Sequence, residues 1–468
     1  MKVDENLSSG EKRTLLAMLL EKRVRKRAPV LAPESGRAQG LKRFATSSSE
    51  MREEVVLDPS IRFDAPLTQR VAKPAGILLT GATGFLGAFL LDELLKRTDA
   101  KIYCLVRCPD LETGRQRIQA TLAKYLSRNG WNNPRIIPVA GDLTQSLFGL
   151  STREFEKLAE AVDCVYHNGA LVKLCYNYEL LKPTNVLGTQ EVIRLASLGR
   201  LKPLHYISTV AACPLKDSSE VQIVRETELD FDGMLYGGYC QSKWVAEQMV
   251  IAARARGLPV GLYRPGIITG HSQTGACNTA DATWRMIKVI VETGVFSEIE
   301  GAMDMTPVDY VSKAIVHMAC SGRAIGQTYH LVNPKPMSLK NFGTWLRNYG
   351  YPFRRIPYEA WRAEMLALAA RPDKELLSSF IMPFLNTEAS NKMPGWLIKM
   401  KLPSSRSGVD QVLSTVGARY GTQVQWDCRN ALQGLVGTDI VCPPIDDRLL
   451  NIYFSYLIRT GYLHPPTQ

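Results

Sequence analysis

The stretch "ILLTGATGFLGAFLLDELL", which begins at Ile77, joins an apolar run to an amphipathic segment through three glycines. Gly81, Gly84 and Gly87 recur every third residue, so a strand can turn sharply and enter a helix whose first N–H groups are bare. The positive end of such a helix faces a phosphate. The stretch therefore predicts a nucleotide-binding turn made by Thr80, Gly81, Thr83, Gly84, Phe85, Leu86 and Gly87.

The next apolar run, "KIYCLVRC", indicates which dinucleotide the turn would hold. A carboxylate at its end would bind the ribose 2'-hydroxyl of NAD, but Arg107 occupies that place, twenty residues after Gly87. A guanidinium suits a 2'-phosphate, and Arg117 lies ten residues further on in a helical segment. We predict NADP (NADPH) as the cofactor, with a solvated arginine at a strand end as the alternative.

Strand-like apolar runs alternate with helical segments along most of the chain. The runs cover residues 77–80, 102–106, 135–139, 164–167, 204–208, 260–263 and 328–332. This alternation predicts an α/β fold, a Rossmann doubly wound parallel sheet that binds ligands at the C-terminal ends of its strands. After about Pro334 the alternation stops, and helical patterns follow at residues 358–368, 374–385 and 446–459.

The chain of 468 residues exceeds one compact domain. We expect a leader helix at residues 1–28, a linker at 29–54, an NADP-binding domain at 55–334, and a smaller, mainly helical substrate domain at 335–468. The leader is amphipathic and ends in the basic run "KRVRKR", which makes it a candidate docking segment. A solvated basic tail is the alternative.

Composition excludes several classes of function. No run approaches the roughly 18 apolar residues of a membrane span, and the first thirty residues lack a signal-peptide core, so we expect a cytoplasmic protein that does not bind membranes. The 10 cysteines show neither a disulfide framework nor the spacing of a metal site. The net charge of +12 suits acidic or phosphorylated partners, but no basic and aromatic module indicates nucleic acid.

The segment "YGGYCQSKWVAEQM" places Tyr239 and Lys243 four residues apart, on one face of a helix. An ammonium beside a phenol lowers the pKa of the phenol, which can then donate a proton near neutral pH. Tyr178 and Lys182 have the same spacing, but only Tyr239 follows a strand that ends in two hydroxyl residues, in "HYISTV". We therefore predict Tyr239 and Lys243 as the acid–base pair and Tyr178 and Lys182 as a surface helix pair.

Together, "TGATGFLG", "HYISTV" and "YGGYCQSKWVAE" resemble the extended short-chain dehydrogenases. Further motifs resemble the thioester reductase domains that end nonribosomal peptide and polyketide assembly lines, akin to those of carboxylic acid reductases and aminoadipate reductase. These motifs are "CLVRC", "GDLTQSLFGL", "VYHNGALV", "NVLGTQEVIRLA", "LYRPGIITGHSQTG", "DMTPVDYVSKAIV" and "LLNIYFSYLIRTGYLHPP". The resemblance runs from about Val55 to Pro466.

The resemblance implies a role for individual residues. Thr209 would polarise the substrate carbonyl, Tyr239 would donate the proton, and Lys243 would also bind the nicotinamide ribose. Asp142 and Leu143 would border the adenine, and Asn168, Gly169 and Ala170 would form the turn under the cofactor. The nicotinamide amide would contact Pro265, Gly266 and Ile267. Lys173 would contact either the cofactor or the pantetheine phosphate.

For some of these residues the alternative to cofactor binding is a purely structural role. In that case Asp142 would only cap a turn, and Pro265 and Gly266 would only form a loop. His167 and His205 lie within apolar strand runs, so we expect packed strand residues rather than bases.

The resemblance also implies the reaction. An acyl or peptidyl chain, bound as a phosphopantetheine thioester to a carrier protein, would be released by NADPH as an aldehyde, which a second NADPH could reduce to an alcohol. We expect a monomer. We expect no adenylation or carrier domain before the reductase pattern, so the alternatives are a free-standing polypeptide that docks on its carrier in trans and an excised terminal domain. The alternatives are a reductase of soluble acyl-CoA, a sugar- or alcohol-oxidising relative, a non-catalytic NADP-binding module, and a Dieckmann-type cyclase, which typically lacks the tyrosine.

Overall fold

The computed structural model describes residues 45–68, 73–126, 132–174, 176–216, 221–229, 232–298, 301–369 and 424–466. The chain divides into two compact units, Met1–Arg43 and Phe44–Gln468. All the described residues belong to the second unit. The predicted leader helix and the predicted helix at residues 374–385 lie outside the described residues.

A parallel sheet of seven strands forms the centre of the second unit, in the order β12-β9-β6-β5-β2-β3-β4. Its strands are β2 (Gly76–Thr80), β3 (Lys101–Val106), β4 (Ile136–Ala140), β5 (Cys164–His167), β6 (Leu204–Ile207), β9 (Val260–Pro265) and β12 (Thr328–Leu331). The predicted Rossmann sheet is therefore confirmed. The strand order reverses between β2 and β5, and ligands of such sheets bind at that point, beyond the C-terminal ends of the strands.

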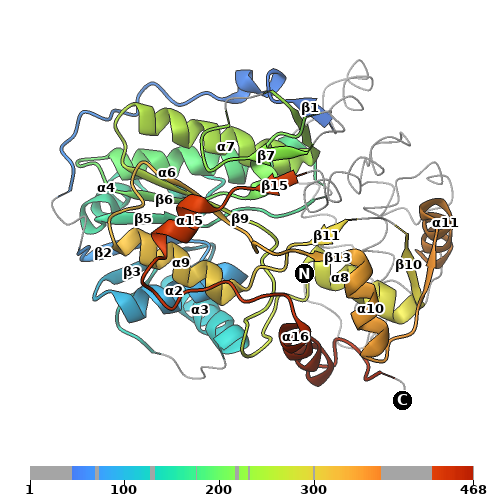
Figure 1. Ribbon diagram of the computed structural model, residues 1–468. Helices are drawn as coiled ribbons and strands as arrows, with labels where there is room; N and C mark the ends of the chain where they lie inside the picture. Colours follow the sequence, from blue (N-terminus) through green and yellow to red (C-terminus); the bar gives the residue numbers. More distant parts are fainter. Residues whose placement is uncertain are drawn as a thin grey trace, which may run out of the picture. The chain divides into compact units, whose positions relative to one another are not determined.

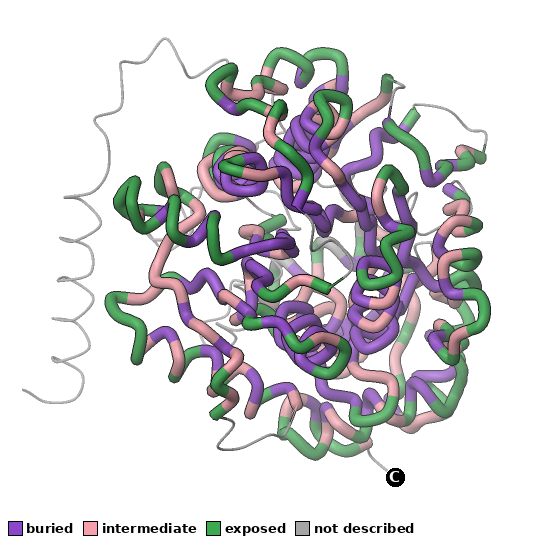
Figure 2. The backbone as a smooth tube through the Cα atoms, turned by 90° about the vertical axis from the view of Figure 1, so that its left-hand side faces the viewer, coloured by how far each residue is buried: buried purple, intermediate pink, exposed green. Residues whose placement is uncertain are grey.

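Helices cover both faces of the sheet because successive strand residues point to opposite sides. Ile77 and Leu79 belong to one buried apolar cluster and Leu78 to another. The first cluster includes α2 (Phe85–Arg97), α3 (Leu111–Leu126) and α9 (Val308–Cys320), and the second includes α4 (Thr152–Ala161), α6 (Gly188–Ser197) and α7 (Gly237–Ala255) (Figure 1). Figure 2 shows the buried segments inside and the exposed segments on outer turns and helix faces. No helix in the described ranges is long and apolar enough to cross a membrane.

The predicted linker at residues 29–54 contains regular structure from residue 45 onward. Strand β1 (Ala45–Ser47) pairs antiparallel with β8 (Met234–Tyr236), and a short 3-10 helix, η2 (Glu50–Glu54), follows. The pairing partner lies almost two hundred residues away, so no local pattern could have indicated it.

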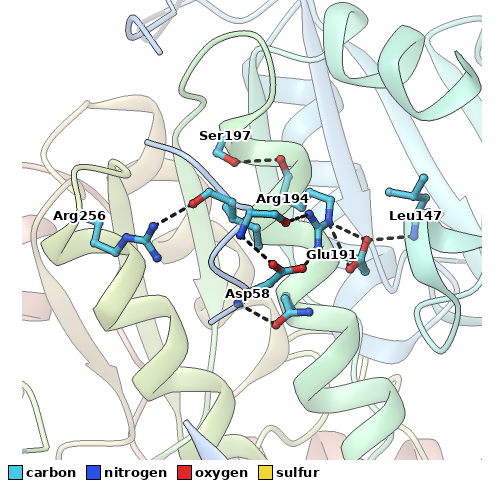
Figure 3. Close-up of polar contacts among 9 residues, drawn as sticks. Asp58, Leu147, Glu191, Arg194, Ser197 and Arg256 are labelled. Atoms are coloured by element: carbon cyan, nitrogen blue, oxygen red, sulfur yellow. Dashed lines mark hydrogen bonds and ion pairs between the residues drawn. The ribbon is translucent and has the colours of Figure 1, made fainter. Parts of the chain in front are cut away.

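Polar contacts fix the next segment to α6 and α7. The Arg194 guanidinium bonds the Asp58 carboxylate and also Glu191 Oε2, at 3.2 Å, and Arg256 donates to the Ile61 carbonyl at 2.9 Å (Figure 3). The hydrogen bond from Arg194 holds the pKa of Asp58 at about 2. The segment before the sheet is thus attached to the outer side of two helices.

A third apolar cluster lies beside the sheet. Trp284 and Ile287 of α8 (Ala282–Thr293) pack there with Phe342 of α10 (Leu339–Asn348) and with Tyr453 and Phe454 of α16 (Asp447–Arg459). Helix α8 precedes residue 334, so the expected boundary between 334 and 335 does not separate this cluster from the sequence assigned to the sheet. The third cluster contains residues from both sides of that boundary, because the apolar faces of α8, α10 and α16 meet only in the folded chain.

The chain returns to the sheet after residue 423. Strand β15 (Val424–Trp426) pairs parallel with β7 (Gln222–Val224), and α15 (Arg429–Gly434) places Ala431 in the first cluster. Smaller elements complete the described parts: η3 (Ser146–Gly149), α5 (Tyr178–Lys182), π-helical η4 (Pro183–Leu187), η5 (Val210–Ala212), β10 (Val295–Ser297), β11 (Ala302–Met303), β13 (Met337–Ser338), β14 (Arg354–Ile356) and α11 (Tyr358–Ala369).

Candidate functional site

The glycine turn joins β2 to α2 where the strand order reverses. Gly81 has a φ of +73°, which favours glycine. A Cβ on Gly87 would lie 1.9 Å from the Gly81 carbonyl oxygen, so the helix packs onto the turn only without a side chain. Gly84 is the N-cap of α2, no side chain caps the helix, and its first turn holds no acidic residue. The first N–H groups are therefore available to an anion, and the turn fits a dinucleotide pyrophosphate.

A buried chain of hydrogen bonds connects this turn to β5 and α6. The Gly169 N–H donates to Thr80 Oγ1 at 2.8 Å, and Thr80 Oγ1 lies 2.7 Å from His167 Nδ1. Thr189 donates its hydroxyl hydrogen to the Asn185 carbonyl at 2.6 Å and therefore accepts from His167 Nε2 at 3.0 Å. Nδ1 of the neutral imidazole then accepts from the Thr80 hydroxyl. Burial lowers the pKa of His167 to about 3, so the imidazole is neutral. His167 is a packed strand residue, as predicted.

The predicted residues after β5 lie against the glycine turn. Asn168 Nδ2 donates to the Gly81 carbonyl at 3.4 Å, and a Cβ on Gly169 would meet Leu143 at 2.7 Å. Ala170 follows in the same turn, half-buried. Lys173 lies further out, exposed on the loop between β5 and α5.

The two predicted arginines come together at the end of β3. Both are exposed, and the Arg117 guanidinium donates to the Arg107 carbonyl. At the end of β4, Asp142 Oδ1 accepts the Thr144 N–H at 2.9 Å. The carboxylate of Asp142 therefore does cap a turn, the alternative that the sequence left open, while the residue still lies at the expected edge of the sheet.

Glu191 supports this same edge and was missed by the sequence reasoning. Leu147 and Phe148, in η3, have φ values of 50° and 60°, which side chains other than glycine rarely adopt. The Glu191 carboxylate accepts the Leu147 N–H at 2.9 Å (Figure 3). The Phe148 carbonyl accepts the Asp142 N–H at 2.8 Å. Glu191 is thus a support for the turn at Asp142, and only its place three residues before Arg194 hinted at a polar role.

The predicted catalytic residues come together at the ends of β6 and β9. Thr209 follows β6, accepts the Ala211 N–H at 3.1 Å and donates to the Pro265 carbonyl at 3.5 Å. Tyr239 lies half-buried in the first turn of α7, facing Thr209. Burial raises the pKa of Tyr239, and the side-chain contact with Thr209 partly offsets the increase. Two hydroxyl groups therefore meet at one point.

Lys243 lies one turn further along α7 but differs from the prediction in its contacts. Its ammonium donates to the Tyr206 hydroxyl at 2.9 Å and to the Ile207 carbonyl at 3.0 Å. Burial lowers the pKa of Lys243 to about 7, against the opposing effect of the Glu247 carboxylate. We expected Lys243 to lower the pKa of Tyr239, whereas burial of the phenol dominates and the ammonium is bound to acceptors on β6.

The neighbouring hydroxyl, Ser208, is already engaged. It donates to the Glu247 carboxylate, which also forms a 2.7 Å ion pair with Arg264. The side chains of Glu247 and Arg264 are both 0% exposed. This pair ties α7 to β6 and β9, and it was not predicted, although a charge inside each of the apolar runs "WVAEQM" and "GLYRPG" was the available signal.

Asp304 fixes the turn of Pro265, Gly266 and Ile267 after β9. Its buried carboxylate accepts N–H groups from Ile267 at 3.2 Å and Asn333 at 2.8 Å, and the hydroxyl of Thr306. A Cβ on Gly266 would lie 1.7 Å from Asp304 Oδ2, so this position requires glycine. Burial raises the pKa of Asp304 to about 6. Asp304 begins the motif "DMTPVDYVSKAIV", but the sequence pattern predicted no role for it.

The remaining predicted residues are structural. Tyr178 is buried rather than on the surface, and both Tyr178 and Lys182 donate to Glu54 Oε2 of η2, at 2.9 Å and 2.6 Å. His205 lies buried 3.1 Å from the Tyr263 hydroxyl, and burial lowers its pKa to about 3. His205 is a packed strand residue, as predicted.

Comparison with known proteins assigns the family. The family model "Male sterility protein" matches residues 79–315. The crystal structure of the terminal R domain from the myxalamid PKS-NRPS pathway is 42% identical, with a TM-score of 0.76, over 90% of this chain and 100% of that chain. The chain belongs to the thioester reductase (R) domains of nonribosomal peptide and polyketide synthases. The R domain of a Mycobacterium tuberculosis synthetase is 25% identical, with a TM-score of 0.63, over 90% of this R domain and 100% of that one.

Curated relatives agree with this assignment. A linear gramicidin synthase polypeptide of Brevibacillus parabrevis is 38% identical over 88% of the R domain, and the L-2-aminoadipate reductase of Eremothecium gossypii is 31% identical, in its large subunit, over 84%. The R domain spans 8% of the first protein and 28% of the second. It is a reductase of the extended short-chain dehydrogenases, with an NAD(P)-binding domain.

The contacts of Asp304 predict a loss of cofactor affinity in Asp304→Asn. The amide keeps the volume but turns an NH2 group toward one of three donors, which releases the 265–267 turn. We expect affinity for the reduced dinucleotide, measured by fluorescence titration, to fall about tenfold. Asp163→Asn is the control, because that buried carboxylate accepts two N–H groups at the opposite end of β2. Equal affinity losses in the two variants would contradict a specific role for Asp304.

The lowered pKa of Lys243 predicts a pH-dependent stability. The folded protein releases this proton near pH 7, whereas the unfolded chain keeps it up to about the ordinary 10.5, so stability rises with pH between these values. Relative to Lys243→Met, the unmutated protein should gain up to about 1.4 kcal/mol of unfolding free energy per pH unit. Urea unfolding without cofactor at pH 7.5 and 9.5 measures this difference, and identical pH profiles of the two proteins would contradict it.

Proposed function

We propose that the R domain releases an acyl or peptidyl chain from the phosphopantetheine thioester of a carrier protein, by NADPH-dependent reduction to an aldehyde. The observation that carries the proposal is the meeting of the Thr209 and Tyr239 hydroxyl groups at the sheet edge that holds the glycine turn. Two neighbouring hydroxyl groups suit a carbonyl oxygen that becomes an oxyanion, because each can rotate to donate to it.

The residues divide the chemistry between them. When bound, the reduced nicotinamide supplies a hydride to the thioester carbonyl carbon. Thr209 donates a hydrogen bond to the carbonyl oxygen, and Tyr239 donates its proton there, which gives a hemithioacetal. The carbon–sulfur bond then breaks, the sulfur takes up the hydroxyl proton and leaves as the pantetheine thiol, and the aldehyde is released. The Lys243 ammonium stabilises the Tyr239 phenolate until solvent returns the proton.

A carrier protein is the proposed donor of the substrate. The net charge of +12 suits an acidic carrier and its phosphodiester. A basic leader at residues 1–28 would add to this attraction. Soluble acyl-CoA presents the same pantetheine arm without the carrier surface, so a comparison of the two thioesters tests how much the protein surface contributes.

The exposed pair of Arg107 and Arg117 supports a preference for NADPH over NADH. Arg107→Asp should weaken binding of NADPH about ten- to a hundredfold and change NADH binding much less, because the guanidinium would meet only the 2'-phosphate. Titration of both dinucleotides against both proteins measures the ratio. Equal affinity of the unmutated protein for the two dinucleotides would contradict the assignment.

The role of Tyr239 predicts a large loss of turnover in Tyr239→Phe. Only a hydroxyl is removed, so the fold and cofactor binding should remain, while NADPH consumption with a carrier-bound thioester should slow by roughly 10²- to 10⁴-fold. The decay of NADPH absorbance measures turnover, and mass spectrometry identifies the aldehyde or alcohol.

Tyr178→Phe is the matched control, because it removes a buried phenol with a lysine four residues later and a bond to Glu54 instead of the site. Its turnover should be unchanged. Turnover like that of the unmutated protein in Tyr239→Phe would exclude the mechanism, and product formed without NADPH consumption would indicate a cyclase.

A further inference from the structure

Two polar groups beside the third apolar cluster are buried without a hydrogen-bond partner: the Ser297 hydroxyl of β10 and the Trp361 indole N–H of α11. Each residue is only 2% exposed. Burying an unpaired donor costs about 1–3 kcal/mol, so each of these groups needs an explanation.

Ser297 and Trp361 face one small apolar cluster. Val295 belongs to that cluster together with Trp361 and Met365, and residues two apart on a strand share a face, so Ser297 points to the same side as Val295. In the parallel pairing of β10 and β14, Ser297 is opposite Ile356, which packs against the same cluster. The two unpaired donors therefore lie in one apolar environment, named here the α8–α11 cluster.

The α8–α11 cluster extends toward the catalytic tyrosine along α8. Asp281, the N-cap of α8, is close enough to Tyr239 to raise the pKa of its phenol. Ala282 and Met286 pack against the cluster, and Val289 is part of it. Seven residues separate Ala282 from Val289, which corresponds to about 10 Å of helix. If the reactive carbonyl of a bound acyl chain lies at Tyr239, the part of the acyl chain beyond its first few carbons would reach Ser297 and Trp361.

We propose that Ser297 and Trp361 form a polar subsite that binds a carbonyl oxygen within the acyl or peptidyl chain. The proposal rests on the proposed function, because it places the body of that substrate along α8. An indole N–H only donates and a hydroxyl can donate, so the pair suits a hydrogen-bond acceptor. The side chains around it are apolar, which favours a neutral amide or ketone over a carboxylate, whose burial would need a counter-charge.

Another unpaired group does not share this subsite. Arg355 Nε is also buried without a partner, but Arg355 is opposite Phe296 in the pairing and therefore lies on the other face of the strands. Phe296 belongs to the third apolar cluster instead. The subsite thus draws on two neutral groups that can donate, and a carbonyl oxygen, which has two lone pairs, is an acceptor that suits them.

The test compares ligands of equal length that differ in one oxygen. Stable amide analogues of acyl-pantetheine, one with a saturated chain and others with a keto group at successive carbons, are titrated calorimetrically against the cofactor-loaded protein. The unmutated protein should bind one keto analogue about tenfold more tightly than the saturated one. Trp361→Phe and Ser297→Ala, which keep most of the volume, should each reduce this preference to about twofold or less.

Trp345→Phe is the control, because it shortens an indole of the third apolar cluster that packs against Phe342 and Phe454. It should keep the preference for the keto analogue even if stability falls. An unmutated protein without any preference, or variants that weaken all analogues equally, would overturn the subsite and indicate groups satisfied by water or left unpaired.

Turnover of the matching carrier thioesters separates the two proposals. If the keto preference in binding disappears in Trp361→Phe while no thioester is reduced by the unmutated protein, the subsite stands and the proposed reaction fails. If both thioesters are reduced and binding shows no preference, the reaction stands and the subsite is wrong.

Discussion

The buried ion pair of Arg264 and Glu247 connects the elements on which the site depends. Removing one partner of such a pair leaves an uncompensated charge and typically costs about 3–5 kcal/mol. Glu247 lies one turn beyond Lys243 on α7, and Arg264 lies just before Pro265 on β9, whose carbonyl accepts from Thr209. The pair therefore sets the distance between the helix that carries the tyrosine and the strand end that receives the threonine.

The same polar network reaches the C-terminal segment. The Arg264 guanidinium lies 3.1 Å from His330 Nε2 of β12, and the backbone N–H of His330 donates to the Glu226 carboxylate at 2.8 Å. Glu226 also accepts N–H groups from Asn430 and Ala431 at the start of α15. The segment that returns after residue 423 is thus connected through Glu226 and His330 to β12 and β9. A substitution in α15 would therefore be felt at β9 through hydrogen bonds as well as through packing.

The sequence pattern predicted the features that neighbouring residues determine, whereas contacts between distant segments determine the others. The glycine turn, the seven strands and the pair Tyr239 and Lys243 follow from periodicity and spacing, which neighbouring residues determine. Asp304 and the acceptors of Lys243 could not be found this way, because their partners come from β6, β9 and the end of β12. The third cluster, which joins α8 to α16 across residue 334, shows the same limit: apolar spacing identifies a helix but not its neighbour.

In the proposed mechanism, the charge of Lys243 explains how a phenol with a raised pKa could act as an acid. Burial lowers the pKa of Lys243 to about 7, and the Glu247 carboxylate, which opposes this decrease, is itself bound to Arg264 and Ser208. A phenolate formed at Tyr239 would supply the missing negative charge one helical turn away. In the proposed mechanism, loss of the tyrosine proton and retention of the lysine proton would favour each other, because the phenolate and the ammonium attract one another. Tyr239 would then donate its proton near neutral pH only when the substrate oxygen takes the proton and Lys243 keeps its own, so the proposed acid strength of Tyr239 depends on the assembled site.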